Sequence, residues 1–124
     1  MSVIQFQRIH SEDAGRSSIE DASVGLMRKD YAPPAPPLYT SLPEEATQCL
    51  FLELPAGWVG EWHPTPVRQW LIVLSGRGLF EGEDGSTRQF RAGDCILLED
   101  IEGKGHRTTV TGKEPVRMMA VHLP

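Results

Sequence analysis

Short runs of apolar and β-branched residues, separated by glycine and proline, make up most of the chain. Twelve glycines and ten prolines interrupt these runs, and no segment keeps a helical period over several turns. This punctuation is typical of strands joined by turns. It predicts strands at 3–9, 23–29, 46–54, 67–74, 78–83, 87–91, 95–99, 107–110 and 116–123. Strands this closely spaced favour a sandwich or a barrel.

Two N-terminal segments depart from this pattern. Residues 11–21 are polar, and Ser11 precedes Glu12 and Asp13 as a helix cap would, so a short helical turn is expected there. Residues 31–39 are rich in proline, which favours polyproline II geometry. We expect an extended arm that lies across the barrel or a partner subunit, with a flexible linker as the alternative. Residues 1–45 would then add strands and an arm to the domain whose barrel core is residues 46–124.

Composition narrows the function classes. The 124 residues suit one domain, and a net charge of −5 without a basic patch argues against nucleic-acid binding. The longest apolar run, residues 70–74, is too short to cross a membrane. The first residues lack the pattern of a signal peptide. Cys49 and Cys95 share no disulfide or metal-type spacing, so we expect a cytoplasmic protein.

The stretch from Gly57 to Gly76 carries a motif. His63 stands six positions after Gly57, Thr65 follows two positions later, and Gln69 precedes Gly76. This spacing resembles the first motif of the cupin superfamily, with Thr65 in the place of a second histidine and Gln69 in the place of a glutamate.

A second stretch resembles the other cupin motif. It opens with Gly93 and Asp94 and reaches His106, two residues late, with Glu99 in the place of a proline and Val110 in the place of an asparagine. The resemblance implies a small all-β protein, a single-domain cupin-like jelly-roll β-barrel. It further implies that a metal, where one is bound, sits inside the barrel on the two motifs.

Strand alternation assigns faces to the first motif. Residues two apart share a face, so an inward His63 takes with it Glu61, Thr65, Val67, Gln69 and Leu71, unless Pro64 and Pro66 break the strand. The opposite row is then Trp62, Arg68, Trp70 and Ile72. This row is apolar for a solvent-facing surface, and cupins often pair through such faces. We therefore expect a homodimer.

The candidate metal ligands are His63, Gln69 and His106, all of them neutral. A divalent ion binds more weakly to neutral ligands than to a set that includes a carboxylate. Glu61 lies roughly 6.5 Å from His63 along the strand and can supply one, which would give the two-histidine, one-carboxylate set of non-haem iron sites. Iron, manganese, nickel and zinc are the candidate ions.

Three readings of the site stay open. The first is a barrel that binds a small organic molecule, with metal-dependent oxygenase, isomerase or lyase chemistry as the resemblance implies. The second is a metal-free binding or sensing module, in which His63 and His106 are an acid–base pair or hydrogen-bonded remnants. The third is a structural dimer with an empty barrel. Glu99, Asp100 and Glu102 form an acidic stretch that we expect to be a solvated loop.

Overall fold

The chain is built from β-strands. The structure, a computed structural model, describes residues 2–12 and 14–124. Its strands are β1 (Ser2–Ser11), β2 (Ser17–Lys29), β3 (Leu38–Thr40), β4 (Gln48–Leu54), β5 (Gln69–Ser75), β6 (Arg77–Gly82), β7 (Thr87–Arg91), β8 (Cys95–Leu98), β9 (His106–Val110) and β10 (Val116–His122). No helix in the described part of the chain is long and apolar enough to span a membrane.

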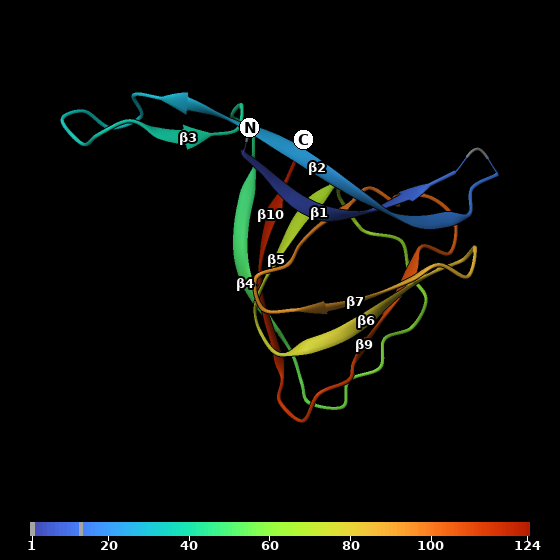
Figure 1. Ribbon diagram of the computed structural model, residues 1–124. Coiled ribbons are helices and arrows are strands. Elements are labelled where there is room, and N and C mark those ends of the chain that lie inside the picture. Colours follow the sequence, from blue (N-terminus) through green and yellow to red (C-terminus); the bar gives the residue numbers. More distant parts are fainter. Residues whose placement is uncertain (1, 13) are drawn as a thin grey trace.

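The strands form two sheets that face each other (Figure 1). The larger sheet has seven strands in the order β3-β2-β1-β8-β5-β10-β4, and the smaller has the order β7-β6-β9. Side chains from both sheets meet between them in one apolar cluster. Its most deeply buried members include Ile9, Val73, Phe80, Phe90, Ile96, Val116, Met118 and Ala120. The expected all-β jelly-roll architecture is confirmed.

The alternation expected for the first motif holds only where a strand forms. In β5, Gln69, Leu71 and Val73 are buried in the barrel, while Trp70 and Ile72 point to the outer side and are partly exposed. Residues 61–68 belong to none of the strands, because Pro64 and Pro66 lack the N–H groups that a ladder requires. The alternation that places Gln69 and Leu71 inward consequently does not extend back to Glu61.

The helical turn expected at residues 11–21 is wrong. Ser11 ends β1, and the residues from Ser17 onward already belong to β2, which pairs with β1 over residues 17–26. Arg8 is ion-paired with Glu20 across these strands, which explains why the strand looks polar in the sequence. Asp13, which the expected turn included, lies outside the described residues.

The proline-rich segment is the tip of a hairpin. β2 continues beyond the barrel and pairs with the short β3, so that the two strands project as a ribbon (Figure 1). A backbone hydrogen bond from Ala35 N to Ala32 O closes the turn at the tip. The extended polyproline arm is therefore corrected to a two-stranded arm, defined here as residues 27–42.

Candidate functional site

His63 and His106 are joined by a pair of backbone hydrogen bonds. His63 N donates to His106 O and His106 N donates to His63 O, each over 3.0 Å. Residues directly opposite each other in an antiparallel pair present their side chains on the same face. The two rings accordingly lie with centroids 4.9 Å apart. The extra residues in the second motif therefore do not separate the two histidines.

Gly105 permits this close approach. It has a φ of +76°, and a Cβ atom at this position would lie 2.0 Å from the carbonyl oxygen of His63. Only glycine fits so near to another backbone at a positive φ. Its own carbonyl accepts a hydrogen bond of 2.5 Å from the buried Ser17 hydroxyl. The loop before β9 is thus held from both sides.

Asp100 orients His106. Its Oδ2 atom accepts a hydrogen bond of 2.6 Å from His106 Nδ1, and the side chains of Asp100 and His106 are 0% and 3% exposed. The expectation of a solvated acidic loop is wrong for Asp100. Its other oxygen, Oδ1, is buried without a hydrogen-bond partner among the described residues. Because Nδ1 donates to the carboxylate, Nε2 is the ring nitrogen that carries a free lone pair.

His63 has the same tautomer as His106. Its Nδ1 lies 2.8 Å from the carbonyl oxygen of Glu61, which can only accept, so Nδ1 donates and Nε2 keeps its lone pair. The His63 side chain is exposed where that of His106 is buried, which places it at the mouth of the barrel. Glu61 is exposed, and it contacts His63 through its backbone carbonyl oxygen.

Gln69 is held by Thr65. The Thr65 hydroxyl donates to Val67 O over 2.7 Å, so it can only accept from Gln69, whose Nε2 lies 2.9 Å away. This chain fixes the orientation of the amide and directs its oxygen away from Thr65. Both side chains are buried. Thr65, which stands in place of a second histidine, therefore acts through Gln69.

A small pocket joins these groups. Its volume is about 140 Å³, with His63, Gln69 and His106 on its wall. The rest of the lining is mainly apolar: Leu52, Leu54, Trp58, Leu71, Phe80, Leu98, Thr108 and Met118. The structure thus brings together three of the four residues predicted from the sequence. Site roles for these residues stay predictions.

The donor set is incomplete for a divalent ion. His63 Nε2, His106 Nε2 and the Gln69 oxygen are neutral, and no group of three His, Cys, Asp or Glu side chains with metal-ligand geometry occurs within residues 2–12 and 14–124. One feature nevertheless suits a metal. Ligating histidines usually donate their second nitrogen to a carboxylate or a carbonyl, as both histidines do here.

Glu99 anchors the loop that carries Asp100. It forms ion pairs with Arg8 of β1 and with Arg68, whose Nη2 lies 2.8 Å away. Burial alone would raise the pKa of Glu99, but the hydrogen bonds from Arg8 and Arg68 outweigh it and lower the pKa. The carboxylate is therefore charged at neutral pH and ties the end of β8 to β1 and to the residues just before β5, the two strands that flank β8 in the sheet.

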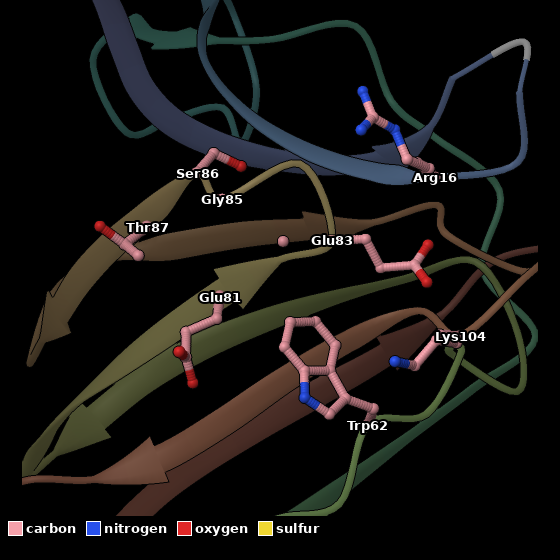
Figure 2. Close-up of a pocket in the computed structure, with 9 residues that line it drawn as sticks. Arg16, Trp62, Glu81, Glu83, Gly85, Ser86, Thr87 and Lys104 are labelled. Carbon is pink, nitrogen blue, oxygen red and sulfur yellow. The ribbon is translucent and has the colours of Figure 1, made fainter.

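Trp62 lies beside a different hollow, outside the barrel (Figure 2). The hollow has a volume of about 370 Å³, and Lys104 Nζ lies 5.6 Å from the centroid of the Trp62 ring. Glu81 and Glu83 also line it, but Glu81 pairs with Arg107 and Glu83 accepts from Ser17 N. Since its charged groups are engaged within the chain, the barrel pocket is the stronger candidate site. The contact of Lys104 with Trp62 links the loops that carry the two histidines.

Solved structures share the fold. A protein with a double-stranded β-helix domain from Klebsiella pneumoniae aligns with 23% identity and a TM-score of 0.51, over 61% of this chain and 65% of that chain. A cupin 2 conserved barrel domain protein from Salinispora arenicola aligns with 21% identity and a TM-score of 0.51, over 82% and 76%. The cupin domain of Cnp3 from Schizosaccharomyces pombe aligns with 14% identity and a TM-score of 0.51, over 99% and 84%. At these identities the likeness shows the fold alone.

Sequence comparison gives the family. No curated protein matches the chain with significant similarity. The cupin domain profile, however, matches residues 50–122, which run from within β4 to the end of β10 and include both histidines. That match spans more than half of the chain and agrees with the two-sheet barrel described above. The chain belongs to the cupin domain family.

Proposed function

We propose that the barrel binds a small organic molecule that is mainly apolar and carries one O–H or N–H donor. The observation that carries this proposal is the buried hydrogen bond between Asp100 and His106, which leaves His106 Nε2 as an acceptor beside an apolar pocket. His63 offers a second acceptor of the same kind at the mouth. A ligand that contacts either of these acceptors must therefore supply the hydrogen of the hydrogen bond.

The size of the pocket limits the ligand. At about 140 Å³ it is smaller than pockets for drug-sized molecules, which begin at roughly 300 Å³. An apolar cavity of about 150 Å³ is enough for benzene. We therefore expect a ligand of about that size, such as a small phenol, alcohol or weak acid.

The same geometry suits proton transfer. When His106 takes a proton at Nε2, the imidazolium stays in contact with the Asp100 carboxylate, which stabilises the new charge. His106 would then be the base, and its Nε2 would return the same proton to another atom of the ligand. If the protein is an enzyme, an isomerase or lyase reaction is the class that this pair supports.

Calorimetry with phenol and benzene as probes tests the binding proposal. Both molecules match the pocket in size, and only phenol has a donor. We expect phenol to bind roughly fivefold more tightly than benzene, since a hydrogen bond to a neutral acceptor contributes about 1 kcal/mol. The preference should disappear in His106→Ala. Equal affinity for both probes in the wild type, or no binding of either, would contradict the proposal.

A metal-dependent activity is the second candidate. It is favoured by the way in which both imidazoles donate through Nδ1 and leave Nε2 free. His63, His106 and Gln69 would hold the ion, which would supply Lewis-acid or redox chemistry to a bound molecule. Elemental analysis after loading with iron, manganese, nickel or zinc tests this. One ion per chain that is lost in both His63→Ala and His106→Ala supports it, and no bound ion in the wild type rejects it.

A further inference from the structure

Two arginines stand directly opposite each other at one end of the smaller sheet. Arg77 is the first residue of β6 and Arg91 the last of β7, and the register of these antiparallel strands pairs the two. Directly opposed residues present their side chains on the same face, with Cβ atoms roughly 4.5–5.5 Å apart. Like charges in this position destabilise a sheet. The pairing is therefore unfavourable unless something neutralises both guanidinium groups.

The described part of the chain does not supply that countercharge. Most arginines of this protein are ion-paired with a carboxylate, namely Arg8, Arg16, Arg68, Arg88, Arg107 and Arg117. Arg77 and Arg91 form no such pair within residues 2–12 and 14–124. Asp94 lies close to Arg91, but its Oδ2 atom accepts from the backbone N–H of Arg91 over 2.9 Å. The two guanidinium groups are thus available to an anion from outside.

A hollow adjoins both side chains where the loops after β5, β7 and β9 meet. Its volume is about 460 Å³, and its lining consists of Gly76, Arg77, Arg91, Ala92, Gly112, Lys113 and Glu114. Three cations and one carboxylate give this lining a net charge of +2. The chain as a whole has a net charge of −5, so the hollow is a local exception. An anion is the ligand that this charge favours.

Gly112 leaves room for the Arg77 side chain. A Cβ atom at Gly112 would lie 3.1 Å from Arg77 Cγ and 3.2 Å from Arg77 Nε. The arginine therefore lies against the backbone of the loop after β9, which restricts the conformations that it can adopt. A side chain held in this way loses less entropy when a ligand binds. The loop that carries Lys113 thus also positions Arg77.

A phosphate group matches this arrangement of donors. Guanidinium groups offer planar forks of N–H donors that bind phosphate oxygens in pairs, so two forks on one face can hold a single tetrahedral anion. A phosphate monoester carries nearly two negative charges at neutral pH, which offsets both arginines. A volume of about 460 Å³ is within the range of small-molecule sites and leaves room for the organic part of such an ester.

The surrounding charge favours a small ligand over a nucleic acid. Glu114 lines the hollow, and Asp94 lines a neighbouring hollow that shares Arg77 and Arg91. A nucleic acid binds through many phosphate contacts at once, and here its further phosphates would meet these carboxylates. A single phosphate group needs only the two arginines and Lys113.

We propose that Arg77, Arg91 and Lys113 form a binding site for the phosphate group of a small molecule. This site lies at the opposite end of β9 from His106, roughly 16 Å away along the strand. None of its three cations lines the barrel pocket. Phosphate and the barrel ligand should therefore bind independently, and either proposal can fail without the other.

Calorimetry of the full chain with inorganic phosphate at low ionic strength tests the site. We expect one phosphate per chain, with a dissociation constant of about 1 mM or below. Arg77→Gln and Arg91→Gln should each weaken binding about tenfold or more, because each removes charge-assisted hydrogen bonds. Arg28→Gln, which removes the same charge from an exposed position on the arm, is the matched control and should leave the affinity as it is. The proposal is overturned if the wild type binds no phosphate, or if the two site variants bind it as tightly as Arg28→Gln does.

Glycerol 3-phosphate as a second probe separates the two sources of the group. Tighter binding of glycerol 3-phosphate than of inorganic phosphate supports a phosphate ester as the ligand. Equal affinity for the two probes supports a site for phosphate itself. Binding of acetate as tight as that of either probe would overturn the proposal, because acetate has a single charge and no tetrahedral set of oxygens.

Thermal denaturation distinguishes a binding role of the arginine pair from a structural one. Without phosphate, Arg91→Gln should be at least as stable as the wild type, since the change removes two opposed like charges. Added phosphate should raise the Tm of the wild type and leave that of Arg91→Gln nearly unchanged. A Tm of Arg91→Gln well below that of the wild type in the absence of phosphate would contradict the proposal.

Discussion

Asp100 Oδ2 and His106 Nδ1 are 2.6 Å apart in the interior of the barrel, where both side chains are almost completely buried. This contact decides which nitrogen of His106 faces the pocket as an acceptor. It also explains why a carboxylate persists at a position with no access to water. A buried carboxylate without such a partner would be costly, and here the imidazole supplies the hydrogen bond.

Replacement of Asp100 by Asn should reverse the acceptor role of His106. The amide would donate to Nδ1 and move the ring proton to Nε2, which then repels a ligand donor. We expect phenol affinity to fall about tenfold or more, with the barrel still folded. Calorimetry measures the affinity, and Glu102→Gln, at an exposed position of the same loop, is the control. Unchanged phenol affinity in Asp100→Asn would mean that the contact does not set the chemistry of the pocket.

Replacement of Gly105 by Ala should unfold the site. The new Cβ would overlap the carbonyl of His63, so the two backbone hydrogen bonds between His63 and His106 cannot both survive. We expect a loss of more than about 3 kcal/mol in the free energy of unfolding. Gly85→Ala is the matched control, because Gly85 also has a positive φ but meets nothing within 4 Å, and it should cost about 1–2 kcal/mol. Urea denaturation compares the two, and equal losses would contradict this account of Gly105.

Replacement of Gln69 by Glu should strengthen metal binding. The change adds a carboxylate beside the two imidazoles, which completes a set that divalent ions prefer. We expect affinity for manganese, nickel or zinc to rise tenfold or more, roughly 1.4 kcal/mol. Gln89→Glu, on the exposed face of β7, is the control and should leave binding as it is. No gain in Gln69→Glu would show that the three side chains do not converge on one ion.

Glu99 should make stability depend on pH. Its pKa is lowered in the folded protein, so its contribution is present above the unfolded pKa of about 4.3 and is lost as the pH falls through the lower folded value. At neutral pH, Glu99→Gln should lose about 1–3 kcal/mol relative to the wild type. The difference should shrink as the pH falls below the unfolded pKa of about 4.3 and vanish only below the lower folded pKa. Urea denaturation at neutral pH and across this acidic range measures this, and a constant difference would contradict it.

The strand pattern and the two histidines follow from the sequence because both rest on local signals. Glycine and proline mark the ends of most strands, and each motif supplies one histidine, His63 ahead of β5 and His106 at the start of β9, which pair in the structure. The burial of Asp100 does not follow, because it depends on how its loop folds back onto His106. The position of Asp100 just ahead of the Gly-Lys-Gly-His run was the available signal that it contacts His106. Together with Glu99 and Glu102, however, it resembles a solvated acidic stretch.

The N-terminal part was harder to predict for a different reason. The first residues of β2 include Ser17 and Glu20, whose polar side chains are satisfied by Gly105 and Arg8 on other segments of the chain. The prolines near residue 33 favour extended geometry locally, but the pairing of Arg28 with Tyr39 closes them into a hairpin. In both cases tertiary pairing overrides local propensity.

Nitrogen-15 NMR of the histidine side chains tests the central claim most directly. The account predicts that Nδ1 carries the proton and Nε2 is unprotonated in both His63 and His106 of the neutral protein, and that addition of phenol shifts the Nε2 resonance of His106. Asp100→Asn should exchange the two nitrogen signals of His106 and leave those of His63 as they are. A proton on His106 Nε2 in the wild type, or an Nε2 resonance that does not respond to phenol, would contradict the account.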